Sequence, residues 1–269
     1  MSKLLIVGHR GFAGSSIYEA ARKQYCVEGI SSNECEQIPR ANYDLVINAG
    51  GRIWGDITVV RQALMSSART AILHARSSHC PILHIGSAVE YGARSTPTLL
   101  AENDDLYPKS EYAEAKIRSW HWIKAEASHG AFSLRSSLIL SPSISHQSLL
   151  GKVRNTALFN KDLFPVSPSI LAMKRNPIHI QDFVSAVLAV TRCLLTDGTV
   201  RLPTVLNCGG DEALRVCDLA NQVLTFVKFP FKYDCPTKTS QYELVSSRQL
   251  KSHTGWNPTH SIRNGDWLI

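Results

Sequence analysis

The residues with the clearest chemical potential are a tyrosine and a lysine four positions apart, Tyr112 and Lys116. The run from Ser110 to His129 is rich in Ala, Glu and Lys and contains no Gly or Pro, which predicts a helix. Side chains at i and i+4 share one face of a helix, about 5–6 Å apart. We expect the lysine ammonium to lower the pKa of the phenol and prepare Tyr112 for proton transfer near neutral pH.

A glycine turn near the N-terminus predicts a nucleotide site. The run Lys3–Val7 predicts a buried parallel strand and residues 12–24 predict a helix, with Gly8-His-Arg-Gly11-Phe-Ala-Gly14 between them. Such a turn lets backbone approach a pyrophosphate, while the helix N-terminus supplies N–H groups and partial positive charge. The spacing is G-x-x-G-x-x-G rather than the more usual G-x-G-x-x-G.

Alternating strands and helices predict an α/β fold with a doubly wound parallel sheet of Rossmann type. The expected strands are residues 3–8, 26–31, 43–49, 81–86 and 131–139, and the expected helices are 12–24, 56–78, 110–129 and 181–196. The segment between Ile30 and Asp44 is too short for helix–strand–helix, so the sheet lacks a strand there or the crossover is compressed. Because the pattern loosens after Ser141, we expect a dinucleotide-binding domain (1–140 with 178–197) and a small C-terminal substrate-binding lobe (141–177 with 198–269).

Further segments follow in a characteristic order. They are Gly86-Ser87-Ala-Val-Glu-Tyr91-Gly92, Arg175-Asn-Pro-Ile-His-Ile-Gln-Asp182, Val205-Leu-Asn-Cys-Gly-Gly210 and Gly255-Trp256-Asn-Pro258. With the glycine turn and the Tyr/Lys pair, they resemble the extended short-chain dehydrogenase/reductases, the family of nucleotide-sugar epimerases, dehydratases and 4-ketoreductases. The resemblance covers almost the whole chain, and the glycine turn is most similar to that of the GDP-fucose synthases.

The resemblance implies a catalytic set of Ser87, Tyr112 and Lys116. Tyr112 would give a proton to a carbonyl oxygen, Lys116 would hydrogen-bond the nicotinamide ribose, and Ser87 would orient the carbonyl oxygen. Substrate contacts are implied at Ser87, Val89 and Arg175, the arginine gripping a diphosphate. The implied coenzyme contacts are Gly8, Arg10, Gly11, Phe12, Gly14, Ser31, Ser32, Asn48, Ala49, Gly50, Arg52, Tyr112 and Lys116.

The absence of acid and base side chains directly after Ser87 narrows the class of reaction. The family's 4,6-dehydratases carry Asp-Glu directly after the catalytic hydroxyl, and GDP-fucose synthase has a cysteine two places after its serine. Here those positions are Ala88 and Val89, which transfer no protons, and Glu90 stands one place too late. This favours reduction of the C4 ketone of a nucleotide-linked 4-keto-6-deoxy sugar. Two alternatives stay open: a 4-epimerase with tightly bound NAD, and a catalytically silent coenzyme-binding regulatory protein.

The second predicted strand bears on the choice of coenzyme. An NAD enzyme usually ends this strand with an acid that binds the ribose hydroxyls, but here it ends in Ile30-Ser31-Ser32. Serine hydroxyls tolerate a 2′-phosphate and Arg10 supplies compensating charge, so NADP(H) is favoured over NAD(H). Glu28 is expected to be solvent-facing, with a role as ribose ligand the weaker alternative.

Composition agrees with a cytoplasmic enzyme acting on an anionic small molecule. The net charge is +7, and the chain shows neither a basic, aromatic-rich run for nucleic acid nor an apolar run long enough to span a membrane. A strand beginning at residue 3 predicts no signal peptide. Seven scattered cysteines and ten histidines show no metal-ligand spacing, which favours reduced thiols and no metal. Apolar stripes on helices 56–78 and 110–129 favour a homodimer.

Overall fold

A six-stranded parallel sheet forms the centre of the computed structural model, which describes residues 1–31, 42–196, 201–238 and 241–269. Its order is β10-β6-β4-β3-β1-β2. The strands are β1 (Lys3–Val7), β2 (Cys26–Ile30), β3 (Leu45–Asn48), β4 (Ile82–Ser87), β6 (Ala131–Ser136) and β10 (Val205–Cys208). Every neighbouring pair is parallel, which confirms the predicted fold class.

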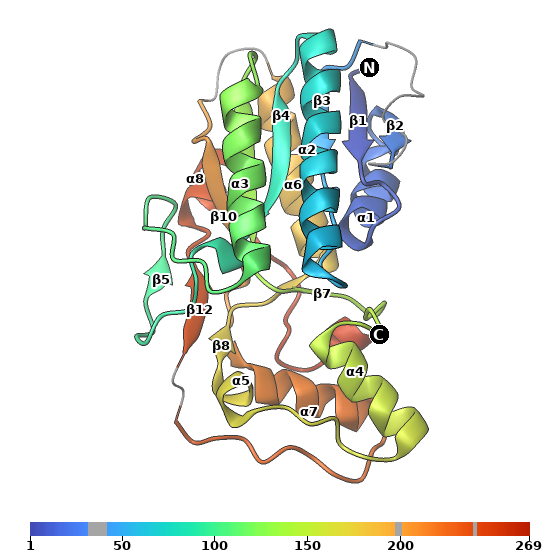
Figure 1. Cartoon of the computed structure of the whole chain (residues 1–269), viewed down its shortest axis with the longest axis vertical. Helices are drawn as coiled ribbons and strands as arrows, with labels where there is room; N and C mark the ends of the chain where they lie inside the picture. Colours follow the sequence, from blue (N-terminus) through green and yellow to red (C-terminus); the bar gives the residue numbers. More distant parts are fainter. Residues whose placement is uncertain (32–41, 197–200, 239–240) are drawn as a thin grey trace.

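Helices cover both faces of this sheet (Figure 1). Helices α2 (Ile57–Ser78) and α3 (Glu111–Glu126) lie on one face, and α1 (Phe12–Ala21) and α6 (Ile180–Leu195) on the other. Strand β1 shows why: Leu4 and Ile6 pack in the core with α1 and α6, whereas Leu5 and Val7 pack in the core with α2 and α3. Alternate side chains of a strand point to opposite faces, so a continuous apolar run is buried on both.

A smaller lobe lies at one end of the sheet (Figure 1). Its helices are α4 (Leu149–Asn155), continued by a π-helical turn (Thr156–Asn160), α5 (Pro168–Ala172) and α7 (Val216–Phe226). They enclose a core that includes Leu150, Val223 and Trp267. A four-stranded sheet of order β11-β8-β12-β5 links the lobe to the main domain, with β5 (Leu99–Leu100), β8 (Lys174–Arg175), β11 (Leu214–Arg215) and β12 (Tyr242–Val245). The remaining elements are β7 (Ile139–Leu140) paired with β9 (Ile178–His179), α8 (Arg248–Thr254) and the 3₁₀ turns Ala88–Glu90 and Asp266–Leu268.

The predicted division of the chain needs one correction. Strand β10, which the sequence analysis assigned to the lobe, pairs with β6 as the outer strand of the main sheet. The four residues Val-Leu-Asn-Cys are too short a run to show a strand period, and the place of β10 is fixed by pairing with a distant strand. At the other edge, no strand of the described ranges pairs beyond β2, and residues 32–41 lie outside those ranges.

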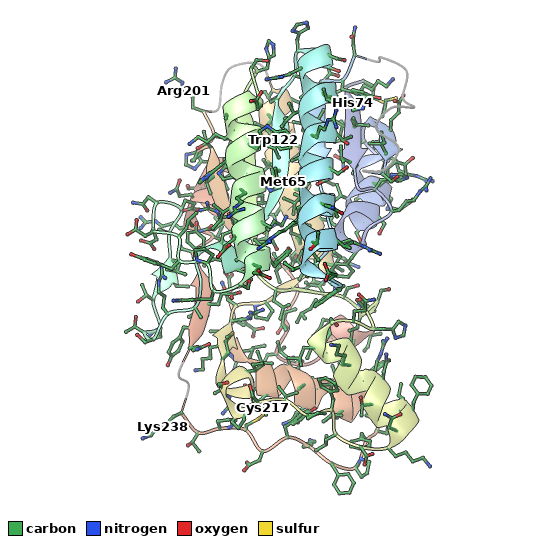
Figure 2. The ribbon with its side chains drawn as sticks, in the orientation of Figure 1. Met65, His74, Trp122, Arg201, Cys217 and Lys238 are labelled. Atoms are coloured by element: carbon green, nitrogen blue, oxygen red, sulfur yellow. A yellow bond between two sulfur atoms is a disulfide. The ribbon has the colours of Figure 1, made fainter. Side chains whose placement is uncertain are left out.

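The expectation that all cysteines are reduced is wrong for one pair. Cys217, on α7 in the lobe (Figure 2), forms a disulfide with Cys235, 18 residues away. Sequence spacing carries no signal for this contact, because it depends on how the segment after α7 turns back over the helix. Cys26, Cys80, Cys193 and Cys208 are free thiols. Within the described residues, no helix is long and apolar enough to cross a membrane.

Candidate functional site

The glycine turn brings two strand ends into contact. Gly8 has a φ of +83°, a conformation that favours glycine, and a Cβ there would lie 2.4 Å from the Cα of Gly50. A Cβ on Gly14 would lie 2.1 Å from the carbonyl oxygen of Gly8. Only glycine therefore allows β1, the end of β3 and helix α1 to approach so closely.

This turn fits the phosphates of a dinucleotide. Helix α1 begins at Phe12 with Gly11 as its N-cap, and no side chain caps its first N–H groups. A cavity of about 200 Å³ opens beside it, and its lining residues are Arg10, Gly11, Phe12, Ser15, Ser16, Ser141 and Ser143. Exposed N–H groups, hydroxyls and an arginine suit a pyrophosphate, so the predicted residues 8–14 fit the coenzyme that the motif implies. Ser141 and Ser143, from the loop after β7, were missed because nothing in the sequence links them to the turn.

Only some of the other expected coenzyme residues lie against the glycine turn. Ala49 and Gly50 lie against Gly8, and Ser31 directly follows β2. The Asn48 side chain is buried in the sheet, where its Oδ1 accepts from the Gly50 N–H (3.2 Å) and its Nδ2 lies 3.3 Å from Nδ1 of His84. Arg52 is exposed in the following loop. Ser32 lies outside the described residues.

Glu28 is not free to bind a ribose. Its carboxylate pairs with the Lys3 ammonium at 2.6 Å and accepts from the Tyr43 hydroxyl at 2.5 Å. These contacts, led by the hydrogen bond from Lys3, lower the pKa of Glu28. The residue holds β1, β2 and the start of β3 together.

Helix α3 presents Tyr112 and Lys116 to the end of β4. Ser110 caps the helix by accepting from the Ala113 N–H at 3.2 Å, which fixes where the first turn begins. The buried Lys116 Nζ donates to the carbonyl oxygen of Ile85 at 2.6 Å, two residues before Ser87. Burial lowers the pKa of Lys116 to about 8, against an opposing effect of the Glu90 carboxylate.

The expected lowering of the Tyr112 pKa is wrong. Burial, followed by the negative charge of Glu90, raises the pKa of the phenol instead. The lysine ammonium points to the Ile85 carbonyl, and its charge does not outweigh the loss of solvent around the phenol. Tyr112 therefore keeps its proton at neutral pH.

Ser87 stands at the end of β4, where a 3₁₀ turn begins. Its Oγ accepts from the Val89 N–H at 3.4 Å, which leaves the hydroxyl proton free to donate. Glu90 completes a capping box, because its Oε1 accepts from the Ser87 N–H at 2.7 Å. Ala88 is buried and Val89 half-buried, so no group that transfers protons follows Ser87 directly.

A buried network lies behind Ser87 and includes Glu90, which the sequence analysis placed one position too late for catalysis without predicting these contacts. Arg135 Nε donates to Glu90 Oε2 at 2.8 Å, and its Nη1 donates to the Tyr91 hydroxyl at 2.9 Å. Tyr91 in turn donates to Asn207 Oδ1 at 2.8 Å. The signal was present in Ser87-Ala-Val-Glu90, which matches the capping-box pattern S-x-x-E.

Arg175 is already paired. On β8 its Nη2 lies 3.1 Å from Oε2 of Glu243, on the neighbouring strand β12, and this carboxylate is buried. The Nε of Arg175 is buried and has no hydrogen-bond partner. Paired with a carboxylate, Arg175 offers a phosphate oxygen less net positive charge than a free arginine would.

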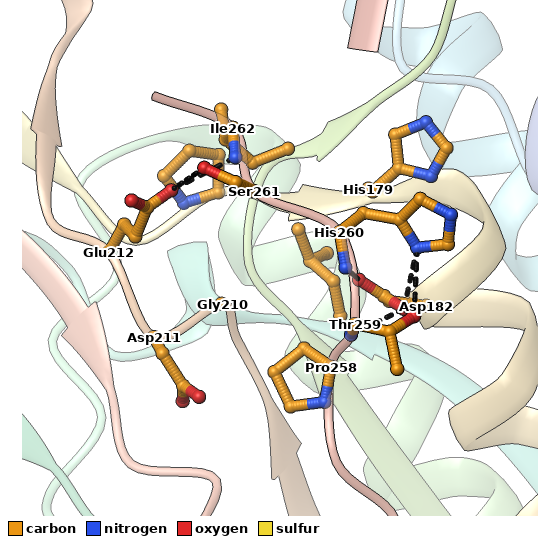
Figure 3. A pocket seen from close by; sticks show the side chains of 12 residues that line it. His179, Asp182, Gly210, Asp211, Glu212, Pro258, Thr259, His260, Ser261 and Ile262 are labelled. Atoms are coloured by element: carbon orange, nitrogen blue, oxygen red, sulfur yellow. Dashed lines mark hydrogen bonds and ion pairs between the residues drawn. The ribbon is translucent and has the colours of Figure 1, made fainter. Parts of the chain in front are cut away.

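A second cavity, of about 220 Å³, contains none of the predicted site residues (Figure 3). It lies where residues 258–262 pass over the start of α6 and residues 210–212. Asp182 accepts hydrogen bonds from the backbone N–H groups of Thr259 and His260 and from both side chains. His179 caps α6 and stacks on His260 at 4.4 Å, so it is a packed histidine. The cavity belongs to the docking of the C-terminal segment, whose polar groups are engaged with one another.

Comparison with known proteins gives the same assignment as the geometry. Residues 4–209 match the model of the NAD dependent epimerase/dehydratase family. The chain is 22% identical over 239 residues to dTDP-6-deoxy-L-talose 4-dehydrogenase (NAD(P)(+)) of Kitasatospora kifunensis, covering 84% of this chain and 74% of that protein. Among solved structures it is similar to a UDP-galactose 4-epimerase (TM-score 0.80, 16% identity, 99% of this chain and 96% of the other). It is also similar to the UDP-glucuronic acid 4-epimerase of Bacillus cereus in complex with NAD (TM-score 0.79, 16% identity, 99% and 98%). The chain belongs to the NAD dependent epimerase/dehydratase family and is an NAD(P)-dependent enzyme of the extended short-chain dehydrogenase/reductase type.

Proposed function

We propose that this enzyme reduces the C4 ketone of a nucleotide-linked 4-keto-6-deoxy sugar, with NADP(H) as its coenzyme. The observation that carries the proposal is the combination of Ser87, Tyr112 and Lys116 around the end of β4 with the apolar Ala88 and Val89. This set suffices for carbonyl reduction, and it lacks the carboxyl groups that elimination of water would need.

Each member of the set has a distinct role. Tyr112, which carries its proton at neutral pH, donates that proton to the carbonyl oxygen as hydride arrives at carbon. Ser87 donates its free hydroxyl proton to the same oxygen and so fixes its position. Lys116, one helical turn after Tyr112, would hydrogen-bond the coenzyme ribose, as the family resemblance implies. The bound coenzyme would supply the hydride; the protein orients the two reactants.

The name of the relative from Kitasatospora supports the choice of position. It is a 4-dehydrogenase of a nucleotide-linked 6-deoxy sugar, and oxidation of a C4 alcohol is the reverse of C4 ketone reduction. Its name also gives both coenzymes as acceptable. For this chain, the missing acid at the end of β2 and Arg10 beside the cavity favour the 2′-phosphate of NADP(H).

The coenzyme preference can be measured without a substrate. We expect wild-type protein to bind NADPH more tightly than NADH in a fluorescence titration, and Arg10→Ala to lose most of that difference by weakening NADPH much more than NADH. A preference for NADH, or a preference for NADPH that survives the substitution unchanged, would contradict this part of the proposal.

The reaction is tested by following NADPH absorbance with a panel of nucleotide-linked 4-keto-6-deoxy sugars. Tyr112→Phe removes only one hydroxyl, so it should fold normally while turnover falls about 10²–10⁴-fold. Lys152→Ala, an exposed position on α4, serves as a matched surface control. If no 4-keto sugar is consumed but a nucleotide hexose is epimerised without net coenzyme change, the epimerase alternative replaces the reductase; if neither reaction occurs, the catalytically silent alternative gains support.

A further inference from the structure

The end of β4 is held on both sides of Gly86. On one side, the carbonyl oxygen of Ile85 accepts from the Lys116 ammonium at 2.6 Å. On the other side, the N–H of Ser87 donates to the Glu90 carboxylate at 2.7 Å. Two side chains of opposite charge therefore fix the two peptide groups that flank Gly86, directly before the Ser87 hydroxyl.

The missing side chain of Gly86 makes room for this arrangement. A Cβ at Gly86 would lie 3.0 Å from Glu90 Oε1 and 3.0 Å from Arg135 Cγ. Glu90 is fully buried and Arg135 nearly so, and their ion pair measures 2.8 Å. Burying two charges is costly unless their hydrogen-bonding groups are satisfied, and here both carboxylate oxygens and two guanidinium nitrogens have partners.

We propose that Glu90 is a positioning residue for the reaction: with Arg135 as its counter-ion, its carboxylate fixes the Ser87 end of β4 and gives Lys116 a buried negative charge to face. This inference rests on the proposed function, in which Ser87, Tyr112 and Lys116 do the chemistry. The charge of Glu90 opposes the effect of burial on Lys116, and it adds to the effect of burial on Tyr112. Both actions favour a charged lysine beside a protonated phenol, the state that donates a proton.

Other ionisable groups surround the pair. Tyr91 donates to Asn207 and stacks under the Arg135 guanidinium at 4.7 Å, and Glu102 accepts from the Asn207 N–H at 2.9 Å. His84, two residues before Gly86 on β4, is buried, and burial with the charges of Lys116 and Arg135 lowers its pKa well below the usual range. His84 is therefore neutral at physiological pH, which leaves the Glu90 carboxylate as the charge that acts on Lys116, with Arg135 as the counter-ion of that carboxylate.

The test is an NMR titration of the full-length chain labelled with ¹³C at lysine Cε, with the Lys116 signal assigned from its absence in Lys116→Arg. In wild type we expect a midpoint near pH 8. Glu90→Gln keeps the size and an acceptor for the Ser87 N–H but removes the charge, so the Lys116 midpoint should fall by about one pH unit. Arg135→Gln leaves Glu90 without its counter-ion and should move the midpoint upward.

Tyr91→Phe is the matched control, because it breaks two hydrogen bonds of the same network without removing a charge and should leave the midpoint in place. A midpoint that is unchanged in either folded charge variant, or that moves equally in Tyr91→Phe, overturns the inference. If Glu90→Gln does not fold, the Lys116 midpoint in Arg135→Gln tests the inference instead. Since no substrate is present, the titration can fail while ketone reduction is observed, and it can succeed while the substrate assay fails.

Discussion

At the scale of single residues, burial shifts the pKa values of Lys116 and Tyr112 more than the nearest charged side chain does. Lys116 loses solvent on entering the α3–β4 contact, which favours its neutral form, while Tyr112 is held in its protonated form by the same loss. Both residues lie on α3, one helical turn apart, so one buried environment shifts both pKa values. At neutral pH the site therefore holds a protonated phenol beside a buried lysine.

The first prediction concerns the pH dependence of Lys116. Its ammonium is present below about pH 8 and is lost above it, so kcat/KM for ketone reduction should fall with a midpoint near pH 8. Lys116→Arg stays charged throughout this range, and its residual activity should lack this fall. Steady-state kinetics from pH 6 to 10 check this. A wild-type profile that stays flat to pH 10 would show that the lysine charge does not control the rate.

The types of these residues could be predicted from the sequence, but their charge states could not. Tyr112, Lys116 and Ser87 follow from spacing and from their place after a strand or on a helix. The partner of Arg175 and the role of Glu90 depend on which strands lie side by side: Glu243 is 68 positions from Arg175, and Arg135 is 45 from Glu90. No local pattern records such a pairing.

At the scale of elements, the C-terminal segment is fastened to α6 by one carboxylate. Asp182 accepts four hydrogen bonds from Thr259 and His260 and is nearly fully buried. Trp256 adds a hydrogen bond from its indole N–H to the Ser185 hydroxyl at 2.8 Å. The closing Gly-Trp-x-Pro segment of the sequence is thus a docking element for the N-terminal end of α6.

The second prediction follows from this contact. Asp182→Asn leaves N–H donors facing an amide, so the free energy of unfolding should fall by about 2–3 kcal/mol. Asp211→Asn is the control, because Asp211 is largely exposed and its pairing with Lys251 should contribute less than about 1 kcal/mol. Urea unfolding of the two variants checks the difference. Equal losses would contradict the assignment of Asp182 as the fastening residue.

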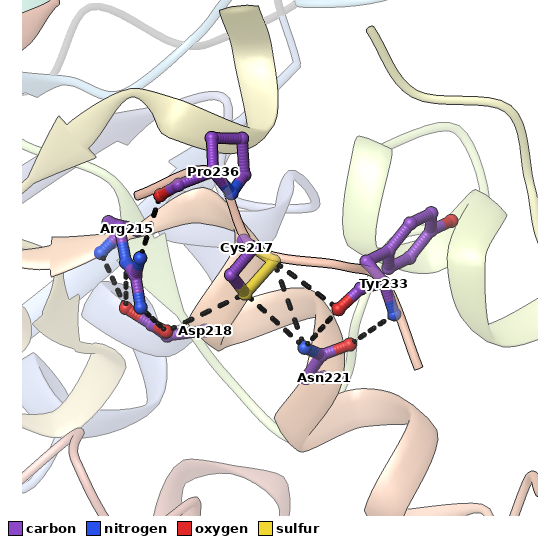
Figure 4. The surroundings of a disulfide bond; sticks show 7 residues. Arg215, Cys217, Asp218, Asn221, Tyr233 and Pro236 are labelled. Carbon is purple, nitrogen blue, oxygen red and sulfur yellow. Dashed lines mark hydrogen bonds and ion pairs between the residues drawn. A yellow bond between two sulfur atoms is a disulfide. The ribbon is translucent and has the colours of Figure 1, made fainter. Parts of the chain in front are cut away.

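The third prediction concerns the disulfide of the lobe (Figure 4). Cys217 is on α7, and Cys235 is in the segment that returns over it, where Asn221 also binds both the N–H and the carbonyl oxygen of Tyr233. Closing a loop of 18 residues stabilises a fold by about 3 kcal/mol. We expect reduction to lower the Tm of wild type but not that of Cys217→Ser/Cys235→Ser. Mass spectrometry that finds both thiols free in the purified, non-reduced protein would contradict the bond.

Elements with a strong period were predictable and short ones were not. Helix α2 was expected at 56–78 and begins one residue later, where Asp56 caps it by accepting from Thr58. Strands β5, β8, β11 and β12 have two to four residues each, too few for a period, and they exist because they pair with one another. These four strands carry Glu243 and Arg175, the predicted substrate contact, and the sequence did not predict how this part of the molecule is arranged.

At the scale of the whole molecule, one face of the main domain is formed by α2 and α3 side by side (Figure 1). Met65 and Trp122 lie half-buried on these helices (Figure 2), and Leu73 of α2 is 48% exposed. Two such helices from each of two copies can form a four-helix contact around a two-fold axis. The domain division, 1–140 with 178–197 against the lobe, stays a prediction apart from the placement of β10.

The fourth prediction is a homodimer through this face. Light scattering at micromolar concentration should give twice the mass of the 29.7 kDa chain, and Leu73→Arg should give a monomer. Leu158→Arg, at an equally exposed leucine of the lobe, should leave the dimer intact. A monomeric wild type, or a dimer unaffected by Leu73→Arg, would reject this face as the interface.

The central claim is that hydride passes from the coenzyme to C4 of a nucleotide-linked sugar with net reduction. The most direct measurement uses NADPH deuterated at the transferable position of the nicotinamide, with a nucleotide-linked 4-keto-6-deoxy sugar as acceptor and mass spectrometry and NMR of the product. We predict one deuterium per product molecule, at C4, with one NADPH oxidised for each, and its loss in Tyr112→Phe. A product that carries no deuterium, formed without oxidation of NADPH, would contradict the account.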